Sequence, residues 1–238
     1  MHRPARRAAG SHFFRPFVTS GRRAIAGRPL APTVDVKHPI LRLDVLAADG
    51  TVSTDHVVFC RLQDQSVRVE ECCRCVRCTS IEEGITPTVS CTLPNTPLEP
   101  ADDPRGERIE VGSMLTEGTV VFSEAVSLEQ ALEVMHGRGR HSVAIVDAGH
   151  RIVGLVHEAS SATRTPRAQR GDMGEVRAAM TSPIAIDERT PVRTALKLLA
   201  AHHLREATVV TRRRVPVGMF RDIDGLRWLA AARRGAAT

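Results

Sequence analysis

The chain has 238 residues, enough for one large domain or two small ones, and its charged and apolar fractions lie near the averages of globular proteins. Aromatic residues make up only 3% of it and tyrosine is absent, which argues against the aromatic stacking platforms of single-strand nucleic-acid binders. The formal net charge is +6, but residues 1–34 contain seven arginines and no other charged residue. Without them the remainder carries a net charge of about −1, so the basic character belongs to the N-terminus.

Residues 1–36 mix Arg, Pro, Gly and Ala without sustained periodicity, and we expect a disordered basic tail. Three roles are open for such a tail: an organelle presequence, an arm that contacts phosphates, or no role at all. No uninterrupted apolar stretch follows the arginines as in a secretory signal, and no apolar run approaches the ~18 residues of a membrane span. We therefore expect a soluble protein, cytoplasmic if it is bacterial.

Residues 37–100 are predicted to form a small, mainly β region. Apolar and polar residues alternate from residue 40 to 46, as in a half-buried strand, and Asp49 with Gly50 supplies a turn. Further strands are expected at residues 56–60 and 86–91. The region holds few large apolar residues, and a thin core of this size usually needs a covalent or metal staple. We expect its core to be separate from that of the following residues.

All six cysteines of the chain lie in this region: Cys60, Cys72, Cys73, Cys75, Cys78 and Cys91. The pattern C-x11-C-x2-C-x15-C, which starts at Cys60 and ends at Cys91, predicts a structural zinc ion held by four thiolates. Its ligands would be Cys60, Cys72, Cys75 and Cys91, with Cys78 as a substitute for one of them. The run C-x2-C-x2-C is also similar to ferredoxin-type iron–sulfur sites, although their fourth Cys and Pro are missing. Disulfides or free thiols are the third alternative, and a cytosolic setting disfavours disulfides.

Residues 101–106 form a polar joint marked by Pro and Gly, beyond which the chain repeats itself at a constant offset of 64 residues. The two units span residues 109–165 and 173–235. The matched positions are Val120 and Ile184, Glu124 and Glu188, Ala131 and Ala195, Leu132 and Leu196, Met135 and Leu199, and Gly154 and Gly218.

Each unit is predicted as strand, helix, strand, strand, helix. The apolar face of the first helix is made by Leu128, Ala131, Leu132 and Met135 in one unit and by Val192, Ala195, Leu196 and Leu199 in the other. Ser127 with Gln130 fits a capping box, and Thr190 with Pro191 fits an N-cap followed by a first helical position. We expect these apolar positions to be core.

The order of elements, the phrases "SLEQAL", "VAIVD" and "GHRIVGLV", and the doubling resemble the CBS domain, named after cystathionine β-synthase. The resemblance covers about residues 109–235 and implies a tandem pair, or Bateman module, of α+β or α/β class. Pairs in this family commonly bind AMP, ATP or S-adenosylmethionine between the repeats, regulate other proteins and form homodimers. Apolar surfaces near Leu198 or Trp228 are the candidates for a dimer contact.

The resemblance also carries a ligand motif: Gly, two apolar residues, Ser or Thr, and three residues later an Asp that binds ribose hydroxyls. In the second unit Gly218 and Asp224 match it, with Arg221 in place of Ser or Thr. In the first unit Ser160 stands where Asp is expected, so the second cleft is the predicted site. Its candidate ligand residues, including those that meet phosphate, are Asp224, Arg221, Gly218, Thr181, Ile184, Thr208, Arg205 and His157.

The sequence therefore predicts a non-enzymatic regulatory or sensor protein whose CBS pair binds an adenosine-type ligand and dimerises. No phosphate loop, nucleophile elbow or paired histidine motif points to an enzyme. Two alternatives are a nucleic-acid-associated protein that uses the basic tail and Arg212, Arg213 and Arg214, and a purely structural dimerisation module.

Overall fold

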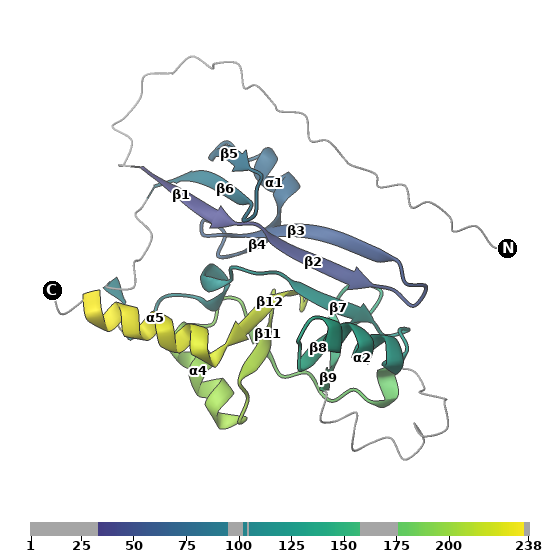
Figure 1. Cartoon of the computed structure of the whole chain (residues 1–238). Helices are drawn as coiled ribbons and strands as arrows, with labels where there is room; N and C mark the ends of the chain where they lie inside the picture. Colours follow the sequence, from purple (N-terminus) through teal and green to yellow (C-terminus); the bar gives the residue numbers. More distant parts are fainter. Residues whose placement is uncertain (1–32, 95–101, 104, 158–175, 236–238) are drawn as a thin grey trace. The chain divides into compact units, whose positions relative to one another are not determined.

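The computed structural model describes residues 33–94, 102–103, 105–157 and 176–235, all of which belong to one compact unit. Most of the predicted basic tail lies outside the described residues, as do Ser160 and the closing helix expected for the first repeat. The fold is mixed α/β, with two tandem repeats after an N-terminal region of strands, as predicted (Figure 1). No helix within the described ranges is long and apolar enough to cross a membrane.

The N-terminal region consists mainly of strands. Its elements are β1 (Val34–Pro39), β2 (Leu41–Leu46), β3 (Val52–Cys60), β4 (Gln65–Arg68), the short helix α1 (Val69–Cys73), β5 (Cys78–Glu82) and β6 (Thr88–Leu93). The three predicted strands are confirmed as β2, β3 and β6, although β3 begins earlier and β6 ends later than predicted. Strand β1 is not predicted from the sequence. It pairs antiparallel with β6, so residues 34–36 are strand rather than tail.

The hairpin between β2 and β3 follows the predicted turn chemistry. Gly50 has a φ of 79°, a conformation that costs glycine little. The Asp49 carboxylate accepts hydrogen bonds from the backbone N–H and the hydroxyl of Thr51, at 2.9 and 2.6 Å. These local bonds fix the register in which β2 and β3 pair.

The two repeats follow each other with the predicted offset. The first contains the 3-10 helix η2 (Val111–Met114), β7 (Thr119–Ser123), α2 (Leu128–Gly137), β8 (Ser142–Val146) and β9 (Ile152–His157). The second contains the 3-10 helix η4 (Val176–Ala178), β10 (Ala185–Asp187), α4 (Val192–Ala201), β11 (Glu206–Val210), β12 (Pro216–Arg221) and α5 (Asp222–Gly235). In each, the first strand pairs parallel with the second, which pairs antiparallel with the third.

The two repeat helices begin differently. The capping box at Ser127 and Gln130 is confirmed, since each side chain bonds the other's backbone N–H. The predicted cap at Thr190 is wrong: α4 starts one residue later, Pro191 is its N-cap, and no side chain caps it. Proline at this position pre-sets the backbone, but it has no side-chain acceptor to offer the helix.

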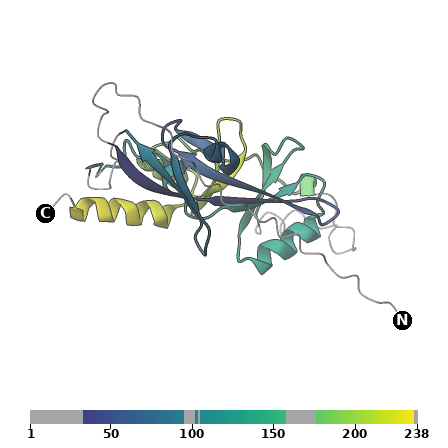
Figure 2. The same ribbon diagram turned by 90° about the horizontal axis from the view of Figure 1, so that it is seen from above.

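Strand β2 joins the N-terminal region to the first repeat. It pairs parallel with β7 on one edge and antiparallel with β3 on the other, which gives one six-stranded sheet in the order β4-β3-β2-β7-β8-β9. The remaining strands form the sheets β1-β6-β5 and β10-β11-β12. Figure 2 shows the strands from above, with α5 (yellow) toward one end of the view and α2 (teal) toward the other.

The apolar side chains of β2 and β3 lie in the cores of both repeats. Leu41 and Val57 share a buried cluster with Phe220 of the second repeat, while Leu43 shares one with Val121 of the first. The expectation that residues 37–100 have a separate core is therefore wrong. Each buried side chain of this size stabilises the fold by about 1.5–3 kcal/mol, which the thin region could not gain alone.

Gly118, the residue before β7, permits the close approach of β2. A Cβ atom at this position would overlap the backbone carbonyl group of Arg42. Backbone atoms cannot rotate away as a side chain does, so any other residue would push β2 off β7.

A buried carboxylate joins the N-terminal region to the second repeat. Glu188 is fully buried, and its Oε2 accepts the backbone N–H of Ser66 at 2.9 Å. Burial raises the pKa of Glu188 above its ordinary value. Nearby, burial first and the charge of Asp64 second raise the pKa of Glu110 to about 7. Both acidic side chains at this junction therefore keep their protons to a higher pH than exposed glutamates do.

We predict that Gly118→Ala destabilises the protein by about 3 kcal/mol, the upper end of the usual cost of overpacking. Urea unfolding of the variant and the parent measures the difference. Gly84→Ala is the matched control, because nothing lies within 4 Å of a Cβ there. An equal loss of unfolding free energy in both variants, or no loss in Gly118→Ala, would contradict the role given to the β2–β7 contact.

We also predict that Glu110 makes stability fall as the pH rises from about 4.5 to about 7. The folded chain holds the Glu110 proton up to about pH 7, whereas the unfolded chain releases it near its ordinary value of 4.5. Within that window the folded state binds more protons, so raising the pH favours unfolding. Melting temperatures measured across this range should decline less in Glu110→Gln than in the parent, whereas the exposed control Glu83→Gln should follow the parent. Parallel curves for Glu110→Gln and the parent would refute the assignment.

Candidate functional site

Two adjoining hollows lie where the repeats and β2 meet, each with a volume of about 250 Å³. The first, the Asp224 pocket, lies between residues 114–118, the end of β12 and the start of α5. Asp224, Arg221 and Trp228 line it. The second, the arginine pocket, lies between β2, β7 and the end of α2. Gly118, Arg140 and Met219 line both hollows, so the two are continuous neighbours.

An ion pair organises the Asp224 pocket. The Arg221 Nε donates to Asp224 Oδ2 at 2.8 Å and its Nη2 donates to Oδ1 at 3.3 Å. Arg227 stands 3.9 Å from the same carboxylate. The carboxylate in turn raises the pKa of the Arg221 guanidinium. A carboxylate has about four acceptor positions, so the Arg221 fork leaves room for hydroxyl donors on Asp224.

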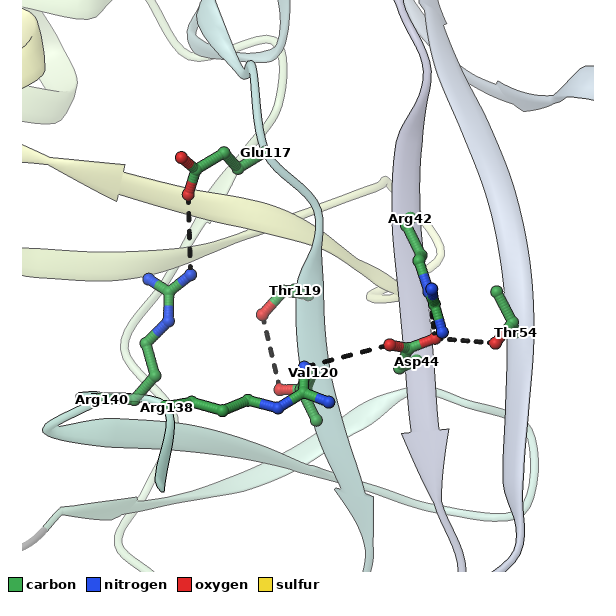
Figure 3. Close-up of polar contacts among 8 residues, drawn as sticks. All are labelled: Arg42, Asp44, Thr54, Glu117, Thr119, Val120, Arg138 and Arg140. Carbon is green, nitrogen blue, oxygen red and sulfur yellow. Dashed lines mark hydrogen bonds and ion pairs between the residues drawn. The ribbon is translucent and has the colours of Figure 1, made fainter. Parts of the chain in front are cut away.

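The arginine pocket combines three guanidinium groups with one carboxylate: its charged lining residues are Arg42, Arg138, Arg140 and Asp44. Figure 3 shows them on β2 and around the end of α2. The Asp44 Oδ1 accepts hydrogen bonds from Arg42 Nε and from the Thr54 hydroxyl, both at 2.7 Å. Arg138 Nη1 lies 4.0 Å from Asp44 Oδ2, and Arg140 Nη2 lies 3.8 Å from Glu117 Oε2. The pocket therefore keeps an excess of positive charge.

The other predicted ligand residues occupy different places. Gly218 lies in β12, where a Cβ atom would come within 2.9 Å of the Leu115 side chain. The side chain of Thr208 is buried, and its hydroxyl contacts the Met219 sulfur at 3.5 Å. The exposed side chain of Arg205 does not line either hollow.

Three further predicted residues do not line the Asp224 pocket. Thr181 exchanges backbone hydrogen bonds with Leu155 of β9, and Ile184 precedes β10. His157 ends β9 opposite Ser142, and burial lowers its pKa below the ordinary value. The structure thus brings together only Asp224 and Arg221 of the predicted set in the Asp224 pocket.

The profile of the CBS domain family matches residues 111–160 and 174–231. The chain contains a pair of CBS domains. Their matched ranges hold Arg138, Arg140 and Asp224, whereas Arg42 and Asp44 belong to a strand outside them. A comparison with curated proteins finds no match.

Solved structures of other CBS domains are similar to about half of the chain. A CBS domain protein from Pyrobaculum aerophilum, complexed with AMP, is 22% identical, with 54% of this chain and 98% of that one covered and a TM-score of 0.46. A CBS domain pair in complex with 5′-methylthioadenosine and S-adenosyl-L-methionine is 19% identical, with 52% and 97% covered and a TM-score of 0.43. The CBS domain of a membrane protein from Sphaerobacter thermophilus is 21% identical, with 52% and 91% covered and a TM-score of 0.43.

The cysteines preceding the CBS pair gather around a small apolar cluster. Its buried members are Val58, Val67, Val89 and Cys72, and Cys60, Cys78 and Cys91 pack against it. Cys78 lies directly opposite Cys91 in the β5–β6 ladder, whereas Cys73 and Cys75 are exposed. Burial first and neighbouring thiols second raise the pKa of Cys72 to about 12 and of Cys91 to about 11. Both are neutral thiols at neutral pH.

The predicted metal site finds no support in the side-chain arrangement. Across the described ranges, no group of three or more His, Cys, Asp or Glu is placed to hold a metal ion. Cys78, the predicted substitute, lies in the cluster, and Cys75, a predicted ligand, is exposed.

The residues of the arginine pocket were not singled out by the sequence. Arg138 and Arg140 lie in the run "HGRGRH" just after α2, a local concentration of basic residues that is a usable signal. Arg42 gives no such signal, because an exposed arginine in an alternating strand is the ordinary polar residue of its outer face.

Proposed function

We propose that the chain is a non-enzymatic regulatory protein whose CBS pair senses an adenosine-type ligand in the Asp224 pocket. The observation that supports this best is the meeting of Asp224 with residues 114–118, which connect η2 to β7, in one hollow of about 250 Å³. A carboxylate suits a ribose diol, and Trp228, which also lines the hollow, offers an aromatic face. A cytoplasmic location accompanies this proposal, in keeping with a free nucleotide as ligand.

Arg221 takes the place that Ser or Thr has in the family motif, and this changes the expected behaviour of the pocket. Its fork already occupies both oxygens of Asp224, so a bound ribose must share the carboxylate with it. The same guanidinium stands ready for a phosphate on the ligand, since arginine binds phosphate through paired N–H donors. AMP, ATP and S-adenosylmethionine are therefore the compounds to test first.

A metal role of the cysteines is a separate proposal that rests on their sequence spacing. The gathering of Cys60, Cys72 and Cys91 around one cluster brings thiols near one another, and a cation there would reverse the preference for neutral thiols. Elemental analysis of protein purified without oxygen tests it. A stoichiometric zinc content supports the proposal, a brown protein indicates iron–sulfur, and metal-free protein leaves the thiols with a packing role.

The nucleic-acid alternative has little in the described residues to favour it. The tail on which it depends lies outside them, and Arg212, Arg213 and Arg214 form an exposed turn between β11 and β12. A steep loss of nucleic-acid affinity with salt would revive it.

We predict that Asp224→Ala lowers the affinity for AMP by about tenfold to a hundredfold, because charge-assisted hydrogen bonds to the ribose are lost. Isothermal titration calorimetry measures it. Asp222→Ala is the matched control at the same helix start, and it should bind as the parent does. Unchanged affinity in Asp224→Ala, or no binding of any adenosine compound by the parent, would contradict the proposed ligand site and favour a purely structural dimerisation module.

We also predict a homodimer through the exposed apolar side chains of α4 and α5. Leu198, Ile223 and Leu226 are 40%, 44% and 53% exposed, while Trp228, the other candidate, packs against the core. Light scattering on the full chain should give a dimer mass, and Leu226→Glu should shift it to the monomer. Val52→Glu, at an equally exposed position on β3, should leave the dimer intact. A monomeric parent would contradict the prediction.

A further inference from the structure

Strand β2 contributes charged residues to the CBS pair although it lies outside both matched CBS ranges. Its parallel pairing with β7 places Arg42 and Asp44 on the wall of the arginine pocket, beside Thr119 of the first repeat. The carbonyl group of Arg42 packs directly over Gly118, a residue that lines both hollows. Strand β2 is therefore built into the site rather than resting beside it.

Asp44 holds the Arg42 side chain in a fixed position. The Asp44 side chain is only 8% exposed and accepts from both Arg42 and Thr54, so it is a buried and paired carboxylate. It engages Arg42 through Nε alone in the described contacts, and the two terminal nitrogens remain donors for another acceptor. A guanidinium that is already oriented loses little side-chain freedom when it binds an anion.

The charges of the arginine pocket favour an anion with several phosphates. Arg42, Arg138 and Arg140 outnumber the single carboxylate of Asp44, which is itself neutralised by its contact with Arg42. Arg140 also lines the Asp224 pocket, where Glu117 is its 3.8 Å neighbour (Figure 3). A ligand that leaves the Asp224 pocket past Arg140 thus enters the arginine pocket.

We propose that Arg42, together with Arg138, binds the terminal phosphates of a nucleoside di- or triphosphate whose nucleoside occupies the Asp224 pocket. This rests on the proposed function for the position of the nucleoside, but the anion pocket itself does not depend on it. Arg42 is then a specificity-determining residue: it sets the preference for longer phosphate chains, while Asp224 sets the preference for the nucleoside. The N-terminal region, through β2, becomes part of the sensor.

Calorimetry in Mg²⁺-free buffer tests this with AMP, ATP and inorganic tripolyphosphate on the full chain. The parent should bind ATP at least about tenfold more tightly than AMP, and Arg42→Ala and Arg138→Ala should each remove about tenfold of the ATP affinity. Both variants should bind AMP within about twofold of the parent. Arg213→Ala, an exposed arginine outside both hollows, should behave as the parent does with all three compounds.

The outcomes separate this proposal from the proposed function. Unchanged ATP affinity in both Arg42→Ala and Arg138→Ala, or equal binding of AMP and ATP by the parent, overturns the phosphate role of β2 while leaving the nucleoside site standing. If no adenosine compound binds, tripolyphosphate binding that weakens in Arg42→Ala still supports the anion pocket, and its absence overturns both. Thermal melting of Arg42→Ala checks that the loss of the Arg42–Asp44 ion pair has not unfolded the sheet. If it has, Arg138→Ala tests the proposal instead, because Arg138 makes only a 4.0 Å contact with Asp44.

Discussion

The parallel pairing of β2 with β7 is the interaction on which the rest of the described structure depends. It makes β2 and β7, which would otherwise be edge strands, interior strands of a six-stranded sheet. It also brings Leu41 and Leu43 into the cores of the repeats. It requires the absence of a side chain at Gly118, because the Arg42 backbone occupies that space. Without this contact the N-terminal region would keep too little buried apolar surface to fold, and the first repeat would present an unpaired strand edge.

The repeats show how one sequence position acquires two roles. Glu124 of the first repeat is partly exposed and pairs with Arg177 at 2.6 Å, an ordinary surface ion pair. Its counterpart Glu188 is fully buried and accepts a backbone N–H from Ser66 in β4. The difference arises because the N-terminal region covers the second repeat there. Burial raises the pKa of Glu188 and of the nearby Glu110 despite the opposing charge of Arg189, so the junction couples the stability of the whole unit to pH.

The cysteines illustrate the same dependence on neighbouring strands. Cys60 ends β3, Cys72 lies in α1 and Cys91 lies in β6, so three separate elements must come together before these thiols meet. Protonated thiols pack as small apolar groups, which is consistent with the buried cluster around Val58 and Val89. Their raised pKa values express first the cost of burying a thiolate and second the repulsion between neighbouring thiolates, and a bound cation would offset both.

The sequence by itself determined the features that depend on residues close along the chain. The 64-residue repeat, the apolar face of α2 and α4, the capping box at Ser127 and the turn at Gly50 all follow from local spacing and local hydrogen bonds. The sequence also indicated Asp224 and Arg221, because both belong to one short motif. Only the tertiary structure decided the partner of β2, the shared cores, the burial of Glu188 and the meeting of Arg42 with Arg138 and Arg140. These depend on strand pairing across a long stretch of chain, and an alternating strand specifies which face is buried but not which neighbour it pairs with.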